Sequence, residues 1–92
     1  MSRRAAVRID HLADLPADLP GVWWRVERRW WADGSSCLHI AKWALQPSTG
    51  RPAPWWPPQY VQVPWQDARA FLQAVLEAVS KSEQVQVGAV DW

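Results

Sequence analysis

The chain has 92 residues and one cysteine, and its 10 lysines and arginines against 9 acidic residues leave a formal net charge of +1. This length suits one domain with a modest core, and the near-neutral charge argues against binding of polyanions by bulk electrostatics alone. Cys37 cannot form an intrachain disulfide and two histidines do not complete a zinc site, so we expect a reducing, cytoplasmic compartment and neither metal nor cofactor.

The first half of the chain predicts strands separated by turns. Alternating apolar and polar residues predict a strand over residues 5–12, and the prolines and glycine of residues 13–21 predict a loop. Residues 22–31, rich in Trp and Val, form the clearest strand of the sequence. Asp33-Gly34-Ser35 is typical of a hairpin turn, and residues 37–45 return as the partner strand. Charged residues interrupt the N-terminal apolar residues, so we expect no targeting or membrane-spanning segment.

Period two sorts the clearest strand into two faces, with one ring of each Trp pair on either side. One face is predicted to hold Val22, Trp24, Val26 and Trp30, with Arg28 among them. The other is predicted to hold Trp23, Arg25, Glu27, Arg29 and Trp31. Trp24 and Trp30 are therefore expected in the core.

The second half predicts a loop, a strand and a helix. Residues 46–58 contain five prolines and predict an extended loop, because proline removes the donors that a central strand needs. Residues 60–63 alternate as a strand, and an apolar stripe at helical spacing predicts a helix over residues 64–81. Residues 82–92 are expected to be a frayed tail or an added edge strand, with Trp92 as part of an interface.

These elements form one α+β domain over residues 1–92, with a core at 5–81. The expected order is β-β-β-β-α, a four-stranded antiparallel sheet with one helix on one face and the other face bare. Basic residues concentrate in the first half, where residues 1–51 carry eight Lys/Arg against five Asp/Glu. The bare face is expected to carry Arg8, Trp23, Arg25, Arg29, Trp31, His39, Trp43, Tyr60 and Gln62.

This aromatic and basic surface suits two kinds of binding. Trp23, Trp31 and Trp43 are predicted to stack unpaired bases, or else to form a dimer interface or a patch covered by the long loop. Arg25 and Arg29 suit phosphate contact, or else a cross-strand salt bridge through Glu27. His39 is expected to be a surface histidine, with base stacking as the alternative, and Cys37 a structural thiol. Trp55 and Trp56 are expected to form a flap over the nucleic-acid face, or a hydrophobic clasp or dimer contact at the sheet edge.

Three stretches resemble the PUR repeat and, more loosely, the PUR/Whirly/positive-cofactor-four group of single-strand binders. Residues 7–10 (Val-Arg-Ile-Asp) are similar to its first strand, and residues 23–40, with an aromatic pair and a short turn, to its central hairpin. Residues 61–75 are similar to the last strand and helix, although residues 46–58 are longer than the family's link. The resemblance implies single-stranded DNA or RNA bound across the sheet, and self-association of the single repeat as a homodimer with packed helices.

The sequence thus predicts a single-stranded nucleic-acid-binding protein rather than an enzyme. It contains no carboxylate pair, nucleophile–base set or phosphate-binding loop at recognisable spacing. The alternative is a small protein-interaction module, of the phage- or plasmid-borne inhibitor type, that uses the same Trp-rich surface.

Overall fold

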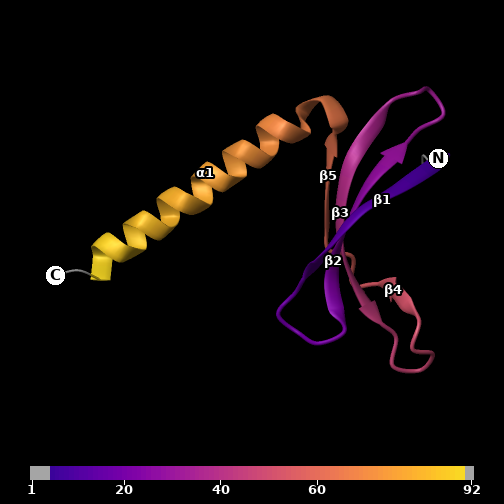
Figure 1. Cartoon of the computed structure of the whole chain (residues 1–92), viewed down its shortest axis with the longest axis horizontal. Helices are drawn as coiled ribbons and strands as arrows, with labels where there is room; N and C mark the ends of the chain where they lie inside the picture. Colours follow the sequence, from indigo (N-terminus) through magenta and orange to yellow (C-terminus); the bar gives the residue numbers. More distant parts are fainter. Residues whose placement is uncertain (1–4, 91–92) are drawn as a thin grey trace.

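The computed structural model describes residues 5–90, with the backbone alone for residues 84–90. The described residues form an antiparallel sheet followed by one C-terminal helix, which confirms the predicted α+β fold (Figure 1). The elements are β1 (Arg8–Pro16), β2 (Val22–Trp30), β3 (Ser36–Leu45), β4 (Pro52–Pro54), β5 (Tyr60–Pro64) and α1 (Trp65–Val90).

Strand β3 lies at the centre of the sheet, between β2 on one side and both β4 and β5 on the other. The order is β1-β2-β3, after which β5 pairs with the first part of β3 and β4 with its last three residues. Strand β4 was not predicted as a strand, and two of its three residues, Pro52 and Pro54, are prolines. It lies at the edge of the sheet, where proline is tolerated because no further strand needs its missing N–H.

The strand registers define two faces. The apolar face carries the side chains paired with those of Trp24, Val26 and Arg28, because directly opposed residues of antiparallel strands point to the same side. Its apolar members are Ala13, Leu15, Val22, Trp24, Val26, Trp30, Leu38, Ile40, Ala44, Val61 and Val63. The opposite face, here the Trp/Arg face, carries Trp23, Arg25, Glu27, Arg29, Cys37, His39, Ala41, Trp43, Tyr60 and Gln62, and on β1 it carries Ile9, His11, Asp14 and Pro16. The predicted alternation of β2 is confirmed.

Strand β1 runs further than the sequence predicted. Residues 13–16, expected in a loop, continue the pairing with β2 after a register shift between His11 and Ala13. The shift inserts Leu12 as a bulge, which moves Ala13 and Leu15 onto the apolar face. The strand was predicted to end at residue 12 because the prolines and glycine of residues 13–21 predicted a loop, whereas the bulge lets the pairing continue to Pro16.

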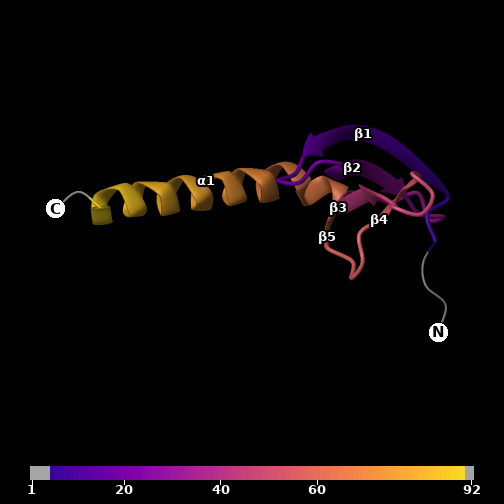
Figure 2. The ribbon, with the colours of Figure 1, turned by 90° about the horizontal axis from the view of Figure 1, so that it is seen from below.

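Helix α1 packs on the sheet through its first turns and then projects beyond it (Figures 1 and 2). Ala68, Leu38 and Val63 are buried at this contact, with 8% or less of each side chain exposed. Residues 82–90, predicted as a tail or an edge strand, continue the helix instead. Trp92, predicted at an interface, lies outside the described residues.

The helix therefore covers only one end of the apolar face. Val61 and Leu15 on the remainder of that face are 44% and 48% exposed, and no large side chain among the described residues is fully buried. The stripe that predicted the helix is exposed as well, with Leu76 at 66%. Within residues 5–90, no helix carries an apolar run that could cross a lipid bilayer.

Candidate nucleic-acid interface

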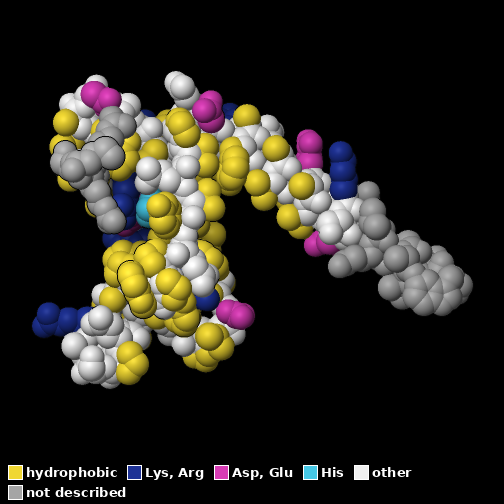
Figure 3. Space-filling view, turned by 180° about the vertical axis from the view of Figure 1, so that it is seen from behind, with side chains coloured by type: hydrophobic (Ala, Val, Ile, Leu, Met, Phe, Trp, Pro, Cys, Tyr) yellow, Lys and Arg dark blue, Asp and Glu magenta, His cyan; other side chains and the backbone are white. Residues whose placement is uncertain are grey.

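The Trp/Arg face is organised in rows that cross the strands. Trp23 of β2 lies opposite Trp43 of β3, and the register extends this row to Pro16 on β1 and Pro54 on β4. All four side chains are rigid and largely apolar. Seen from behind the sheet, basic side chains and a histidine occupy a hollow bordered by hydrophobic side chains (Figure 3).

Arg25 lies in the next row and covers one of these indoles. Its guanidinium carbon is 4.8 Å from the centroid of the Trp43 ring, the distance of a cation–π contact. Opposite Arg25 on β3 is Ala41, and beyond it is Tyr60 on β5, which is 60% exposed. A cation and two aromatic rings thus converge on one part of the sheet.

Glu27 is buried between two arginines. Its carboxylate accepts hydrogen bonds from Arg25 Nε at 2.6 Å and from Arg29 Nε at 3.0 Å, and its side chain is 3% exposed. The salt bridge that was the alternative for these arginines is therefore present, although it runs along β2 rather than across strands. Each guanidinium carries five N–H donors, so one bond through Nε does not exhaust its capacity to bind an anion. Arg25, Arg29 and Glu27 together carry one net positive charge, and Asp14 of β1 lies opposite Arg25 in the register.

His39 lies opposite Glu27 and is 7% exposed, which corrects the expectation of a surface histidine. Its Nδ1 lies 3.0 Å from Gln62 Oε1, and its ring stacks on Tyr60 with 5.3 Å between centroids. Burial lowers the pKa of His39 below its ordinary value of 6.5, and the bond to Gln62 offsets this only in part. The imidazole is therefore neutral at neutral pH, with Gln62 Oε1 as the acceptor for the Nδ1 proton.

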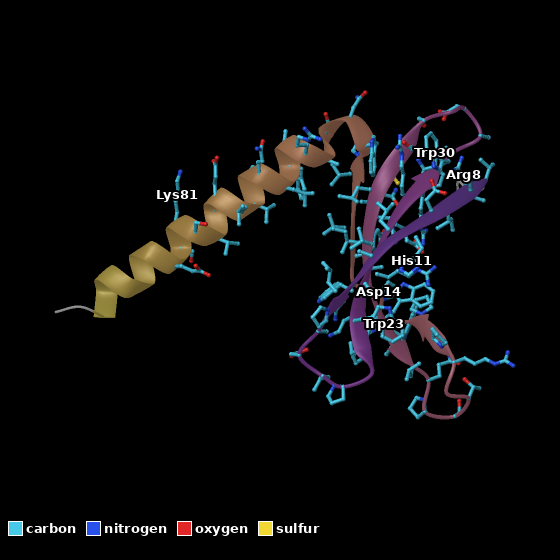
Figure 4. All side chains as sticks on the ribbon, viewed as in Figure 1. Arg8, His11, Asp14, Trp23, Trp30 and Lys81 are labelled. Atoms are coloured by element: carbon cyan, nitrogen blue, oxygen red, sulfur yellow. The ribbon has the colours of Figure 1, made fainter. Side chains whose placement is uncertain are left out.

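Arg8 does not belong to this face. The register places it opposite Trp30 on the apolar side, and its guanidinium carbon is 5.5 Å from that ring (Figure 4). Asp10 binds both residues, accepting from Arg8 Nε and from Trp30 Nε1, each at 2.9 Å. The bond from Trp30, followed by that from Arg8, lowers the pKa of Asp10. The prediction that Arg8 lies on the bare face was wrong, because the sequence does not show which residue of β2 is opposite Arg8.

Trp31 lies just beyond the end of β2 and not within it. Its backbone N–H donates to the carbonyl of Ser35 at 2.9 Å, which makes it the base of the hairpin turn. Of the nine residues predicted on the bare face, seven lie on the Trp/Arg face within strands. Arg8 lies on the other face, and Trp31 lies at the margin.

The two tryptophans of the proline-rich segment have separate environments. The backbone N–H of Trp55 donates to the backbone carbonyl of Lys42 at 2.9 Å, and Lys42 Nζ lies 4.3 Å from the Trp55 ring. Trp55 therefore lies against β3 at the edge of the sheet. Trp56 is 82% exposed and remains available as the outer part of a flap.

The sequence analysis missed the role of Arg28, which was noted only as an intrusion among apolar residues. Its guanidinium carbon lies 4.0 Å from the rings of both Trp30 and Trp65, and its Nε donates to Ser36 Oγ at 3.0 Å. Trp24 and Trp30, predicted in the core, are only half-buried. The sequence signal for the role of Arg28 was its position two residues from Trp30, since residues two apart lie side by side on one face of a strand.

Residues 5–90 contain no group of three His, Cys, Asp or Glu side chains that could hold a metal ion. Cys37, the single cysteine of the sequence, is buried. The side chains of the Trp/Arg face make stacking, cation–π and ionic contacts. Comparison with protein-family models, curated proteins and solved structures finds no match.

Proposed function

We propose that the protein binds single-stranded DNA or RNA across the Trp/Arg face and acts by binding rather than by catalysis. The observation that carries this proposal is the contact of Arg25 with Trp43, beside the row that Trp23 and Trp43 form. A strand with unpaired bases needs aromatic surfaces for stacking and cations near its phosphates, and these lie together here. The resemblance to single-strand binders in the sequence supports the same function.

The charge of the face predicts how binding responds to salt. Glu27 neutralises one of the two arginine charges, so each chain offers one or two phosphate contacts. For single strands the logarithm of the binding constant falls by about 0.7 per tenfold rise in salt for each contact. Stacking, worth about 1–3 kcal/mol per base, then supplies most of the affinity and makes binding tolerant of sequence.

Tryptophan fluorescence tests the proposal directly. Oligo-dT, oligo-dA and an RNA oligomer are titrated at low and at moderate salt, with duplex DNA as the control. Saturable quenching by the single strands, with a shallow salt dependence, is the expected result. Absence of saturable quenching by every single strand at low salt overturns the proposal.

We propose further that two copies associate. A compact monomer of this mass exposes about 5,500 Å², whereas this chain exposes 7425 Å². Its radius of gyration is 16.8 Å, against about 12 Å for a compact domain of this length. The excess surface of two chains falls within the range of obligate homodimers, roughly 2,000–5,000 Å².

The stripe of α1 and the uncovered part of the apolar face are the surfaces that a second copy would cover. Both are apolar, and the helix projects from the sheet instead of returning over it (Figure 2). Light scattering at micromolar concentration is expected to give twice the chain mass, and a monomeric mass contradicts the homodimer. A cytoplasmic location is part of the proposal, in keeping with the single buried Cys37.

A protein-interaction module remains the second candidate, and one observation favours it. Arg25 and Arg29 already bond to Glu27, while Trp56 is 82% exposed on a proline-stiffened segment. Exposed Trp is typical of hot spots for protein partners. If Trp56→Ala abolishes capture of a defined protein partner while oligonucleotide binding is absent in both proteins, this function replaces the first.

A further inference from the structure

A small pocket opens at the edge of the Trp/Arg face, where β3 and β5 meet the proline-rich segment. Its volume is 90 Å³, and Trp43, Trp55 and Tyr60 line it together with Ala41, His39 and Arg29. We infer that this pocket holds one unstacked pyrimidine base of a bound strand. The inference rests on the proposed function and names the position at which binding becomes selective for a pyrimidine over a purine.

The size of the pocket limits its occupant. Pockets for drug-sized ligands measure about 300–1,000 Å³, whereas a single water needs only about 10–15 Å³. At 90 Å³ the space therefore suits one planar ring, with the rest of the ligand outside. Of the two kinds of base, the single ring of a pyrimidine suits this space better than the larger fused rings of a purine.

The small side chain of Ala41 creates the space. Ala41 lies between Arg25 on β2 and Tyr60 on β5 in the same row, and it is 8% exposed. A larger residue here would fill the space between Trp43 and Tyr60. The pocket is thus a consequence of one alanine among large neighbours.

The lining matches the chemistry of a nucleotide. Aromatic rings supply the stacking surface, Arg29 lines the pocket itself, and the Arg25 guanidinium lies 4.8 Å from the Trp43 ring. A cation in the lining favours a ring that is attached to phosphate over the aromatic side chain of a neutral peptide. The pocket also adjoins the Trp23–Trp43 row, so one strand can stack on the row and place a base in the pocket.

The test fills the pocket without changing any charge. Ala41→Leu occupies the space, and Ala44→Leu is the matched control, because Ala44 lies on the same strand but on the opposite face. Oligo-dT and oligo-dA of equal length are titrated against the wild type and both variants, and circular dichroism confirms that each variant is folded. Tyr60→Ala, at a 60% exposed position, provides a second test if Ala41→Leu does not fold.

The wild type is expected to bind oligo-dT more tightly than oligo-dA. Ala41→Leu should weaken oligo-dT binding by about 5- to 150-fold, the value of one lost stacked base, and leave oligo-dA within about twofold. Tyr60→Ala should also weaken oligo-dT more than oligo-dA, and Ala44→Leu should change neither. Unchanged dT preference in Ala41→Leu, or in Tyr60→Ala where that variant is used, overturns the pocket while leaving strand binding intact. If the wild type binds neither oligomer, the proposed function fails first, and both proposals fall.

Discussion

The guanidinium carbon of Arg28 lies 4.0 Å from the ring centroid of Trp65, the first residue of α1. Because α1 meets the sheet only through its first turns, this contact helps to set the direction in which the helix leaves the sheet. The same guanidinium stacks on Trp30, so one side chain joins the hairpin to the helix. An arginine on the apolar face thus has a structural role that its charge alone does not suggest.

Arg28→Ala is expected to lower the free energy of unfolding by about 1–3 kcal/mol. It removes two cation–π contacts worth about 0.5–1 kcal/mol each, together with the bond to Ser36, worth about 1 kcal/mol. Urea unfolding followed by circular dichroism measures the change. Arg51→Ala, in an exposed turn, is the control and should change stability by less than about 0.5 kcal/mol.

Glu27→Gln is expected to weaken the fold and to strengthen nucleic-acid binding. It removes charge-assisted bonds worth about 1.5–3 kcal/mol and frees Arg25 and Arg29 for phosphate. The salt slope of oligonucleotide binding should steepen by about 0.7 for each added contact. Glu77→Gln removes the same charge from the exposed helix, and it should leave the slope unchanged. An unaltered slope in Glu27→Gln would show that these arginines do not contact phosphate.

Trp43→Ala should weaken binding of oligo-dT by about 5- to 150-fold, because it removes a stacking surface worth about 1–3 kcal/mol. Trp30→Ala is the matched control, since Trp30 lies on the opposite face. Folded Trp30→Ala should bind within about twofold of the wild type, although it is less stable. Equal losses in the two variants would argue that the strand does not bind on the Trp/Arg face.

Stability is expected to fall as the pH drops below 6.5, the ordinary pKa of histidine. In the folded protein, burial lowers the pKa of His39, so the unfolded chain takes up a proton first and acid favours unfolding. The loss begins near the unfolded value and is complete below the folded one. Asp10, with its lowered pKa, adds a separate loss as the pH falls below 3.8.

The midpoint of urea unfolding is measured from about pH 7.5 to pH 5, a range in which histidines titrate and carboxylates stay largely ionised. His39→Gln removes the buried imidazole and should flatten the dependence in this range. His11→Gln removes the exposed histidine and should keep the dependence. A wild-type midpoint that does not move across this range contradicts the role of His39.

Val75→Glu should separate the proposed homodimer, because Val75 lies in the exposed apolar stripe of α1 and is 44% exposed in the single chain. Burying an unpaired carboxylate at an interface is strongly unfavourable. Ala70→Glu places the same charge on the opposite side of the helix and should leave the dimer intact. Sedimentation or light scattering gives the mass of each variant. Equal masses for the two variants would show that the apolar stripe of α1 is not part of the interface.

Period-two alternation determined much of the fold. It separated the two rings of the Trp23-Trp24 pair onto opposite faces, and the registers confirm that separation. Helical spacing likewise predicted α1, although it placed the end of the helix nine residues early. These features follow from local geometry, because side chains along one strand or one helix repeat with a fixed period.

Only the tertiary structure decided which residues of different strands meet. The bulge at Leu12 set the register of β1 and placed Arg8 beside Trp30, away from the Trp/Arg face. The pairing of β2 with β3 placed His39 opposite the buried Glu27, and the pairing of β3 with β5 brought Ala41 against Tyr60 to open a pocket. Such contacts depend on register and burial, which no local pattern specifies. The two faces of a single strand, in contrast, follow from local alternation. The sequence by itself therefore determined that tryptophan and arginine share a face, and the tertiary structure decided which of them touch.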